Sequence, residues 1–183
     1  MIKEGDRFDV IIVGGGPAGL FAAFHLAENS NLKILLIEKG RGIAHRECPI
    51  KSNQKCMACK PCNILCGIGG AGLFSDGKLN FIPKLGKTDL TQFMSYAEAQ
   101  ALIDETEQIF SRFGMDGPVY PTALEQAQKI RKTALKHGID LMIIRQKHIG
   151  SDCLPEYISG LVEHVRNRNV LFHTSEEVRD VLV

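Results

Sequence analysis

The segment from Asp9 to Gly19, D-V-I-I-V-G-G-G-P-A-G, limits the fold of this chain more than any other part of the sequence. Val10 to Val13 have the length of a short buried strand, and the glycines that follow fit the pattern G-x-G-x-x-G. The first glycine of that pattern permits a tight turn, the second leaves room for a pyrophosphate, and the third lets a helix pack closely against the strand. A helix-compatible stretch from Leu20 to Glu28 follows, and its free N–H groups and positive dipole end would face the phosphates.

A second apolar run, Ile34 to Ile37, ends at Glu38, nineteen residues after Gly19. An acidic residue at this place can accept hydrogen bonds from the ribose hydroxyls of a dinucleotide. Strand, turn, helix, strand and acid in this order predict a βαβ unit over about residues 7 to 40 that binds a dinucleotide. The motif residues expected to bind it are Gly14, Gly15, Gly16, Pro17, Ala18, Gly19 and Glu38.

Length, charge and the start of the chain bound the class of protein. A length of 183 residues suits one domain, or one domain and part of another. The formal net charge of +1 leaves no basic footprint for nucleic acid. The first apolar run is too short for a signal peptide or a membrane span. We therefore expect a cytoplasmic protein with no nucleic-acid or membrane partner, whose small-molecule substrate and oligomeric state stay unassigned.

Periodicity and capping residues divide the rest of the chain. Residues 41–80 are rich in Cys, Gly, Pro and Lys and show little periodicity, so we expect a long functional loop. A capping box of Thr122 with Glu125 is expected to start one helix, and Asp152 to cap another. The final predicted strand reaches the last residue, and a doubly wound sheet needs more strands, so we expect a truncated chain. The predicted helices cover residues 90–113, 122–137 and 154–168, and the predicted strands cover 139–144, 170–173 and 178–183.

The cysteines after the βαβ unit have a spacing that is typical of iron–sulfur proteins. Cys56, Cys59, Cys62 and Cys66 form C-x2-C-x2-C-x3-C, as in a bacterial ferredoxin segment. The chain has six cysteines and two four-iron clusters need eight, so at most one cluster fits, on the first three with Cys48 or Cys66. Zinc held by C-x-x-C pairs, redox-active thiols beside a flavin, and cysteines that bind nothing stay open as alternatives.

A second glycine run, Gly67 to Gly72, also fits G-x-G-x-x-G, but its context differs. No strand of normal length precedes it, and the segment from Leu73 to Lys78 contains an Asp-Gly turn where a helix should begin. We therefore reject a second dinucleotide fold at this place. A glycine-lined backbone that approaches a flat ring or a phosphate closely is the better interpretation.

These motifs together resemble a known group of proteins. V-G-G-G-P-A-G followed by L-I-E-K-G is typical of flavoproteins with two dinucleotide-binding motifs. Within that group, three further stretches resemble a bacterial family of FAD-dependent dehydrogenases, from about Phe8 to Val183. These stretches are C-K-P-C-N-I-L-C-G-I-G-G-A-G-L-F-S-D-G-K-L, R-Q-K-H-I-G-S-D and V-L-F-H-T-S-E-E-V-R-D-V-L-V.

The resemblance implies an α/β fold, with a Rossmann-like FAD-binding domain of the glutathione-reductase type. A smaller α+β cap domain would interrupt it, and the chain would lack its C-terminal part. The implied domains are residues 1–81, an FAD-binding first part with the Cys- and Gly-rich loop 41–80; residues 82–149, the inserted substrate or cap domain; and residues 150–183, the return to the FAD-binding domain.

The resemblance also implies which residues would hold FAD. Gly14 to Gly19 would hold the pyrophosphate and Glu38 the adenosine ribose. Lys39, Gly40 and Val178 would lie beside the adenine, and Gly70, Ala71 and Gly72 near the flavin. From residue type alone, Arg46 and Lys78 are candidates to neutralise phosphates or a reduced flavin.

The expected function is that of an FAD-dependent oxidoreductase, or its FAD-binding portion. It would pass electrons between the flavin and an organic substrate, with NAD(P) as a candidate electron donor or acceptor. No catalytic residue is identified, which suits an enzyme whose cofactor carries the chemistry. The alternative is a non-catalytic electron-transfer protein that binds an iron–sulfur cluster or zinc on Cys56 to Cys66.

Overall fold

The computed structural model describes residues 2, 5–50, 54–150 and 152–182. Contacts within the chain divide it into two units. The first unit consists of residues 1–75 with 151–183, and the second of residues 76–150. The sequence predicts boundaries after residues 81 and 149, and the functions expected for the two parts stay predictions.

A parallel sheet forms the centre of the first unit. Its strands are β1 (Val10–Val13), β2 (Ile34–Glu38) and β8 (Val170–Thr174), in the order β1-β2-β8. Val13 of β1 pairs with Ile37 of β2, and Glu38 pairs with Thr174 of β8, so the carboxyl ends of the strands lie level. The central strand is apolar at its first four positions, as expected for a strand buried within a parallel sheet. The strands predicted from apolar runs at 10–13, 34–37 and 170–173 are confirmed.

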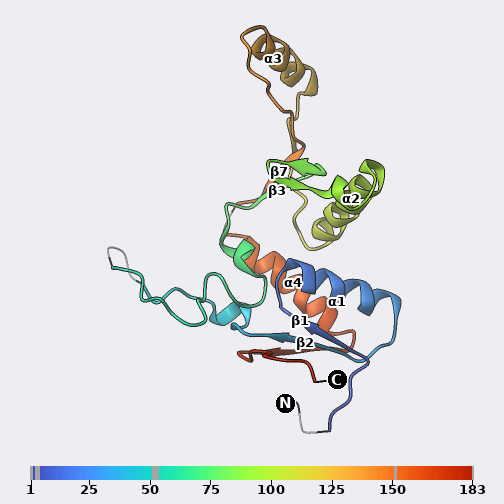
Figure 1. Cartoon of the computed structure of the whole chain (residues 1–183), viewed down its shortest axis with the longest axis vertical. Helices are drawn as coiled ribbons and strands as arrows, with labels where there is room; N and C mark the ends of the chain where they lie inside the picture. The colour runs from blue at the N-terminus through green and yellow to red at the C-terminus, as the bar shows by residue number, and fades with distance from the viewer. Residues whose placement is uncertain (1, 3–4, 51–53, 151, 183) are drawn as a thin grey trace. The chain divides into compact units, whose positions relative to one another are not determined.

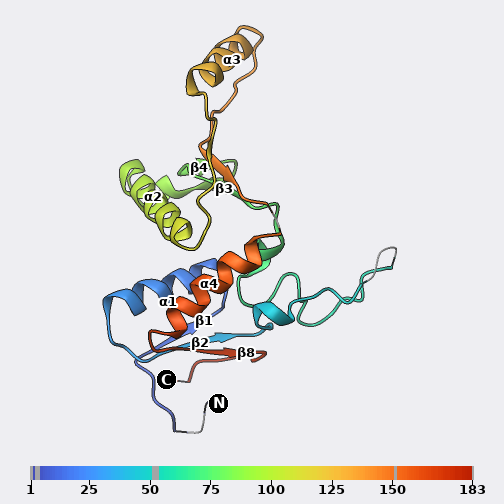
Figure 2. The same cartoon turned by 180° about the vertical axis from the view of Figure 1, so that it is seen from behind.

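Two helices cover one face of this sheet, α1 (Pro17–Asn29) and α4 (Leu154–Arg166) (Figure 1). The view from behind shows the same pair of helices on the same face (Figure 2). Each helix begins with proline in its first turn, where the missing N–H costs no hydrogen bond. The predicted apolar stripe on α4 is confirmed, because its members are all buried: Leu154, Ile158, Leu161 and Val165. They pack in the same core as Leu20, Phe24 and Leu36.

The other face of the sheet carries apolar side chains that the described residues leave exposed. Ile11 is 57% exposed, Val13 60% and Leu171 41%. Strand β1 is also an edge strand, because within the described chain it pairs only with β2. The sheet is therefore covered by helices on one face.

Two expectations for the first unit are wrong. Residues 178–182 form no strand, and residue 183 lies outside the described residues. After β8 the chain turns at Ser175, whose φ is +64°, and residues 178–182 belong to none of the described sheets. The helix α4 has Cys153 at its N-cap, without a side-chain cap hydrogen bond, so Asp152 is not the N-cap residue.

The second unit combines antiparallel strands with helices. Its sheet has the order β3-β7-β6, from β3 (Lys78–Asn80), β7 (Gln146–His148) and β6 (Val119–Tyr120). A separate hairpin pairs β4 (Lys84–Leu85) with β5 (Thr88–Asp89). The helices of this unit are α2 (Tyr96–Arg112) and α3 (Leu124–Lys136). Short 3-10 turns span Leu90–Gln92 in this unit, and Ile43–His45 and Ala71–Phe74 in the first unit.

Helix starts in the second unit differ from the prediction. The capping box lies at Ser95, whose hydroxyl accepts from the Glu98 amide while the Glu98 carboxylate accepts from the Ser95 amide. Helix α3 has Ala123 at its N-cap without a side-chain cap bond, so the predicted box of Thr122 with Glu125 is wrong. Gly138 ends α3 with a φ of +74°, as predicted.

The predicted strand at residues 139–144 is also wrong. The strand in this part of the chain is β7, from Gln146 to His148. The run at 139–144 is apolar, but neither β3 nor β6 pairs with it; they pair instead with Gln146, Lys147 and His148. Apolar character without a neighbouring strand does not make a sheet.

Within the described part of the chain, no helix is both long enough and apolar enough to cross a lipid bilayer.

Candidate functional site

The first glycine turn lies between the carboxyl end of β1 and the start of α1. Gly14 has a φ of +104°, which favours glycine, and its amide donates to the carbonyl of Ile37 at 2.8 Å. A Cβ on Gly19 would collide with the carbonyl oxygen of Gly14, so only glycine lets the helix lie this close to the strand. These are the tasks that the motif predicts for the first and third glycines.

Gly16 has a different environment. A Cβ at this position would meet only the Cα of Gly70, at 3.9 Å, so the protein itself leaves room there. Gly16 is the N-cap of α1, whose first turn carries no acidic side chain. The first amides of a helix have no acceptor within the helix and carry its positive dipole end. The start of α1 therefore combines room beside Gly16 with amides that have no acceptor within the helix, the two features that the motif requires for a pyrophosphate.

Glu38 connects three glycine segments. It is 7% exposed, and its Oε2 accepts from the Gly15 amide at 2.7 Å. Its Oε1 accepts from the amides of Gly40 at 2.7 Å and Gly67 at 2.9 Å. A carboxylate has about four acceptor positions, so one position on Oε2 is not used by these three hydrogen bonds.

The second glycine segment packs against the first one backbone to backbone. The Gly69 amide donates to the Gly15 carbonyl at 2.8 Å. A Cβ on Gly70 would lie 3.2 Å from both the Gly16 Cα and the Pro17 Cδ. The structure therefore places Gly70 against the first glycine turn. Gly70 is the first of the three residues of the second glycine segment that are expected near the flavin.

Arg46 is buried, at 3% exposure, and donates only to backbone carbonyls among the described residues. Its hydrogen bonds reach Ile64 at 2.6 Å, Ile68 and Gly70 at 2.8 Å, and Asn63 at 3.0 Å. Burial lowers the pKa of the Arg46 guanidinium from its ordinary value, and the charge of Glu38 opposes that change. Arg46 thus ties the cysteine segment to the glycine segment, and its donors do not support the expected role on phosphates.

The other cation expected near phosphates, Lys78, lies in the second unit. There it forms an ion pair with Asp76 at 2.8 Å.

Three of the residues predicted to hold the adenosine line one cavity of about 280 Å³ in the first unit: Glu38, Lys39 and Val178. Gly14, predicted for the pyrophosphate, lines it as well. The sequence did not single out Glu176 and Glu177, which line the same cavity directly after β8. Their position at the carboxyl end of a strand is the signal that could have found them.

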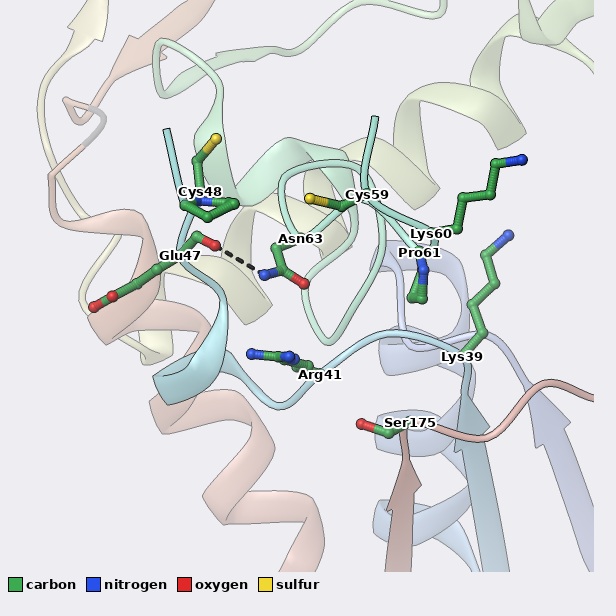
Figure 3. Close-up of a pocket in the computed structure, with 10 residues that line it drawn as sticks. Lys39, Arg41, Glu47, Cys48, Cys59, Lys60, Pro61, Asn63 and Ser175 are labelled. Carbon is green, nitrogen blue, oxygen red and sulfur yellow. Dashed lines mark hydrogen bonds between the residues drawn. The ribbon is translucent and has the colours of Figure 1, made fainter. Parts of the chain in front are cut away.

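A larger cavity of about 570 Å³ lies at the same edge of the first unit (Figure 3). Lys39 lines both cavities. The larger one is lined by Lys39, Arg41, Glu47, Cys48, Pro49, Cys59, Lys60, Pro61, Asn63 and Ser175.

Cys62 differs electrostatically from an ordinary thiol. Hydrogen bonds from the amides of Leu65 and Ile64 lower the pKa of Cys62, and the charge of Arg46 acts in the same direction while burial opposes it. The Cys66 amide donates to the Cys62 carbonyl at 2.8 Å, so the two cysteines lie one helical turn apart.

A metal on the cysteine segment is not shown. Within residues 5–50, 54–150 and 152–182, no three His, Cys, Asp or Glu side chains come together in a way that could hold a metal ion. The iron–sulfur or zinc site expected on Cys48, Cys56, Cys59, Cys62 and Cys66 stays a prediction.

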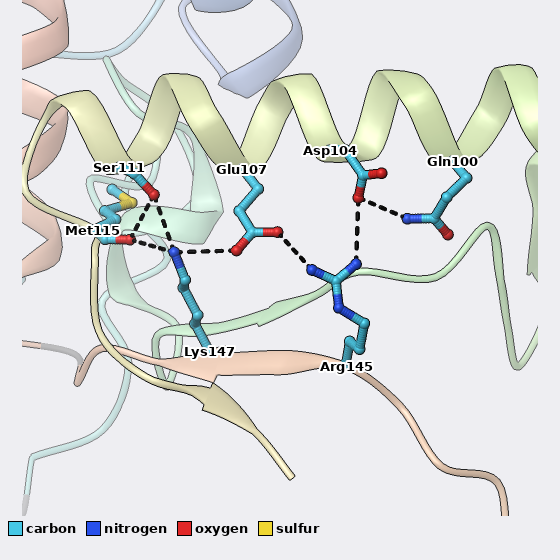
Figure 4. Close-up of polar contacts among 7 residues, drawn as sticks. All are labelled: Gln100, Asp104, Glu107, Ser111, Met115, Arg145 and Lys147. Carbon is cyan, nitrogen blue, oxygen red and sulfur yellow. Dashed lines mark hydrogen bonds and ion pairs between the residues drawn. The ribbon is translucent and has the colours of Figure 1, made fainter. Parts of the chain in front are cut away.

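A polar network in the second unit connects α2 with β7 (Figure 4). The Lys147 ammonium is buried and contacts Ser111 at 3.0 Å, the Met115 carbonyl at 3.3 Å and Glu107 at 3.2 Å. Arg145 bridges the other oxygen of Glu107, at 3.2 Å, to Asp104, at 3.3 Å. These partners neutralise the Lys147 charge and satisfy its donors, so the network holds α2 on the sheet.

Known proteins resemble this chain in three ways. The family model described as pyridine nucleotide-disulphide oxidoreductase matches residues 8–106, more than half of the chain. Glucose oxidase from Penicillium chrysogenum is 51% identical over 37 residues, which are 20% of this chain and 6% of that enzyme. An L-amino acid deaminase from Proteus myxofaciens, solved with anthranilate, aligns with a TM-score of 0.44 at 14% identity, over 96% of this chain and 40% of its own.

NikD, an amino acid oxidase of nikkomycin biosynthesis, aligns with a TM-score of 0.40 at 13% identity, over 92% of this chain and 43% of its own. The chain thus spans less than half the length of these solved structures. The region that the family model matches contains the glycine turn, Glu38, the cysteine segment and the second glycine segment. The chain therefore belongs to the pyridine nucleotide-disulphide oxidoreductase family, with a Rossmann-like FAD-binding fold of the kind that its sequence predicts.

Proposed function

We propose that this protein binds FAD and takes part in an FAD-dependent oxidation or reduction of an organic substrate. One observation carries the proposal: Gly14, Glu38 and Val178, which are far apart in the sequence, line one cavity at the carboxyl edge of the parallel sheet. Ligands of doubly wound sheets bind at that edge. The dehydrogenase family that the sequence resembles is part of the same proposal.

In this proposal, the amides at the start of α1 bind the pyrophosphate in the room beside Gly16. The free acceptor position on Glu38 Oε2 binds a hydroxyl of the adenosine ribose, while its other positions keep the glycine segments in place. Lys39 and Val178 lie beside the adenine. When bound, the flavin supplies the two-electron chemistry, and this chain holds and orients it.

The glycine segment Gly70 to Gly72 would lie at the flavin end, because its first residue already packs on the pyrophosphate turn. A backbone without side chains permits a flat ring to approach it closely. Residues 82–149 would form the substrate or cap domain, and NAD(P) is a candidate for the electron partner.

A titration of purified protein with FAD tests the proposal, and Gly16→Val is the informative variant. A Cβ at residue 16 would meet only the Gly70 Cα, at 3.9 Å, and the extended backbone there suits valine, so we expect the variant to fold. Its side chain would occupy the space proposed for the pyrophosphate. We expect FAD to bind the variant at least about tenfold more weakly than the parent. Fluorescence quenching of FAD measures this directly.

Gly42→Ala is the matched control, because its Cβ would meet no atom within 4 Å. It should bind FAD like the parent protein. Equal FAD affinity of the Gly16→Val variant and the control, or no FAD binding by folded parent protein, would refute the proposed function.

Redox-active thiols are a second candidate function for the cysteine segment, and Cys62 favours it. Two backbone amides and the Arg46 charge stabilise its thiolate, which is the reactive form of cysteine. Cys66 follows one turn later in the chain, near the same Arg46 guanidinium. Oxidation of these two thiols to a disulfide would release two electrons and two protons, which an oxidised flavin would accept.

The pH dependence of alkylation tests the state of the Cys62 thiol. Because the rate depends on the thiolate, a lowered pKa of Cys62 moves the midpoint of the rate profile to lower pH. Iodoacetamide labelling with site-resolved mass spectrometry should give a lower midpoint in folded protein than in protein unfolded by urea. Identical midpoints in both states would remove this candidate. A metal on the segment would instead bring stoichiometric iron and acid-labile sulfide, or zinc, into anaerobically prepared protein.

A further inference from the structure

The larger cavity of the first unit collects positive charge. Lys39, Arg41 and Lys60 line it, against Glu47 as the one acidic lining residue. None of the three cations has an ion-pair partner within residues 5–50, 54–150 and 152–182. The surplus is local, because the whole chain has a formal net charge of only +1. A concave site of one sign attracts ligands of the opposite sign.

The backbone that carries these cations is fixed by hydrogen bonds. Gly40, between Lys39 and Arg41, donates to Glu38 Oε1 at 2.7 Å and accepts from the Ser175 amide at 2.8 Å. The side-chain amide of Asn63 donates to the backbone carbonyl of Glu47 at 2.8 Å, and the backbone carbonyl of Asn63 accepts from Arg46 Nε at 3.0 Å. These hydrogen bonds fix the backbone beside Lys39 and Arg41 and at Asn63, while the side chains of Lys39, Arg41 and Lys60 stay exposed.

Size and lining indicate the kind of anion. A volume of about 570 Å³ lies in the range of small-molecule sites and far exceeds the needs of a lone inorganic ion. Pro49 and Pro61 give the cavity an apolar part for an organic group. Two lysines and one arginine match a doubly charged phosphate better than a singly charged carboxylate, since three cations against one acid leave two positive charges.

We propose that this cavity is a second ligand site, which binds an organic phosphate next to the proposed adenosine site. The phosphate contacts Arg41 and Lys60, and the organic part lies against the prolines. Lys39 lines both cavities, so the two ligands are neighbours. A sugar phosphate and a phosphorylated nucleoside both have this chemistry.

Calorimetric titration with glucose 6-phosphate tests the site, and 2′-AMP in a parallel titration distinguishes a nucleotide from a sugar phosphate. Glucose, adenosine and inorganic phosphate serve as reference ligands. We expect at least one of the two organic phosphates to bind, more tightly than inorganic phosphate, and its dephosphorylated form not to bind. Raising the salt concentration should weaken binding, because the site is open to solvent.

Charge-reversal variants distinguish binding at this cavity from a general effect of the protein's net charge. Lys60→Glu should weaken binding of the organic phosphate by about tenfold. Lys129→Glu on α3 changes the net charge equally, in the second unit, and should leave the affinity unchanged. Glu47→Gln removes the acidic lining residue and should strengthen binding.

The FAD titration tests the proposed function independently of this second site. The Lys60→Glu variant should bind FAD with the same affinity as the parent protein. Binding of FAD without binding of either phosphate would overturn the second site alone. Binding of a phosphate without FAD would overturn the proposed function alone. Equal effects of Lys60→Glu and Lys129→Glu, or inorganic phosphate binding as tightly as both organic phosphates, would also overturn the second site.

Discussion

Glu38 has two tasks at the residue scale, of which the sequence motif predicts one. The motif places an acid where ribose hydroxyls would bind. The structure adds hydrogen bonds from the amides of Gly15, Gly40 and Gly67, which lie in three separate segments. These contacts make Glu38 part of the fold as well as of the proposed site.

Glu38→Gln should therefore destabilise the protein. An amide group of the same shape has one acceptor oxygen, so at least one of the three backbone N–H groups loses its partner. A buried unsatisfied donor costs about 1–3 kcal/mol, and unfolding in urea measures the loss. Glu177→Gln is the control, because this side chain lines the same cavity but is exposed. If both variants unfold at the same urea concentration as the parent, the structural role assigned to Glu38 is wrong.

How much of the site could be predicted depends on the range of the contacts. Gly14 and Gly19 follow from local geometry, since a strand, a turn and a helix in succession require them. Arg46 does not, because its carbonyl partners lie about twenty residues away along a segment without periodicity. A buried arginine and an exposed one look alike in a sequence.

At the scale of the element, prediction succeeded where the pattern was long. β2 and α4 have continuous or periodic apolar residues, and both are confirmed. The strands β3 to β6 have two or three residues each, too few to show a period. The capping box is also a local pattern, but its sequence pattern occurs by chance as well. Ser95 forms a capping box in the structure, and Thr122, which has the same pattern, does not.

The capping box of α2 should give that helix a pH dependence. Hydrogen bonds from Ser95 lower the pKa of Glu98 below its ordinary value. Its contribution is complete above the ordinary pKa of a glutamate and is lost as the pH falls through the lowered pKa of the folded state. Hydrogen exchange should thus show that protection of the first turn of α2 decreases on acidification.

Glu98→Ala should remove that pH dependence and lower the protection already at neutral pH. Glu125→Ala, in the first turn of α3, is the control, since α3 has no side-chain cap hydrogen bond. It should leave the exchange of α2 unchanged. An equal response of α2 to both variants would contradict the role of the capping box.

At the scale of the whole molecule, the order of elements identified the fold class. The division into parts was expected only from the family resemblance, and the surroundings of the sheet did not follow from the sequence. The succession of strand, glycine turn, helix and strand predicts parallel pairing, and β1, β2 and β8 pair in this way. Which residues lie in each unit depends on contacts between distant segments, such as β3 with β7. No local pattern contains that information.

The position of β1 has a consequence for handling the protein. Its outer row of backbone N–H and C=O groups has no partner strand among the described residues, and Ile11 and Val13 make the neighbouring surface apolar. Natural proteins shield exposed edge strands, because an unshielded edge strand pairs with extended segments of other chains and promotes aggregation. Dilute solutions, or a lysine in place of Ile11 acting as a gatekeeper, would keep the molecules apart.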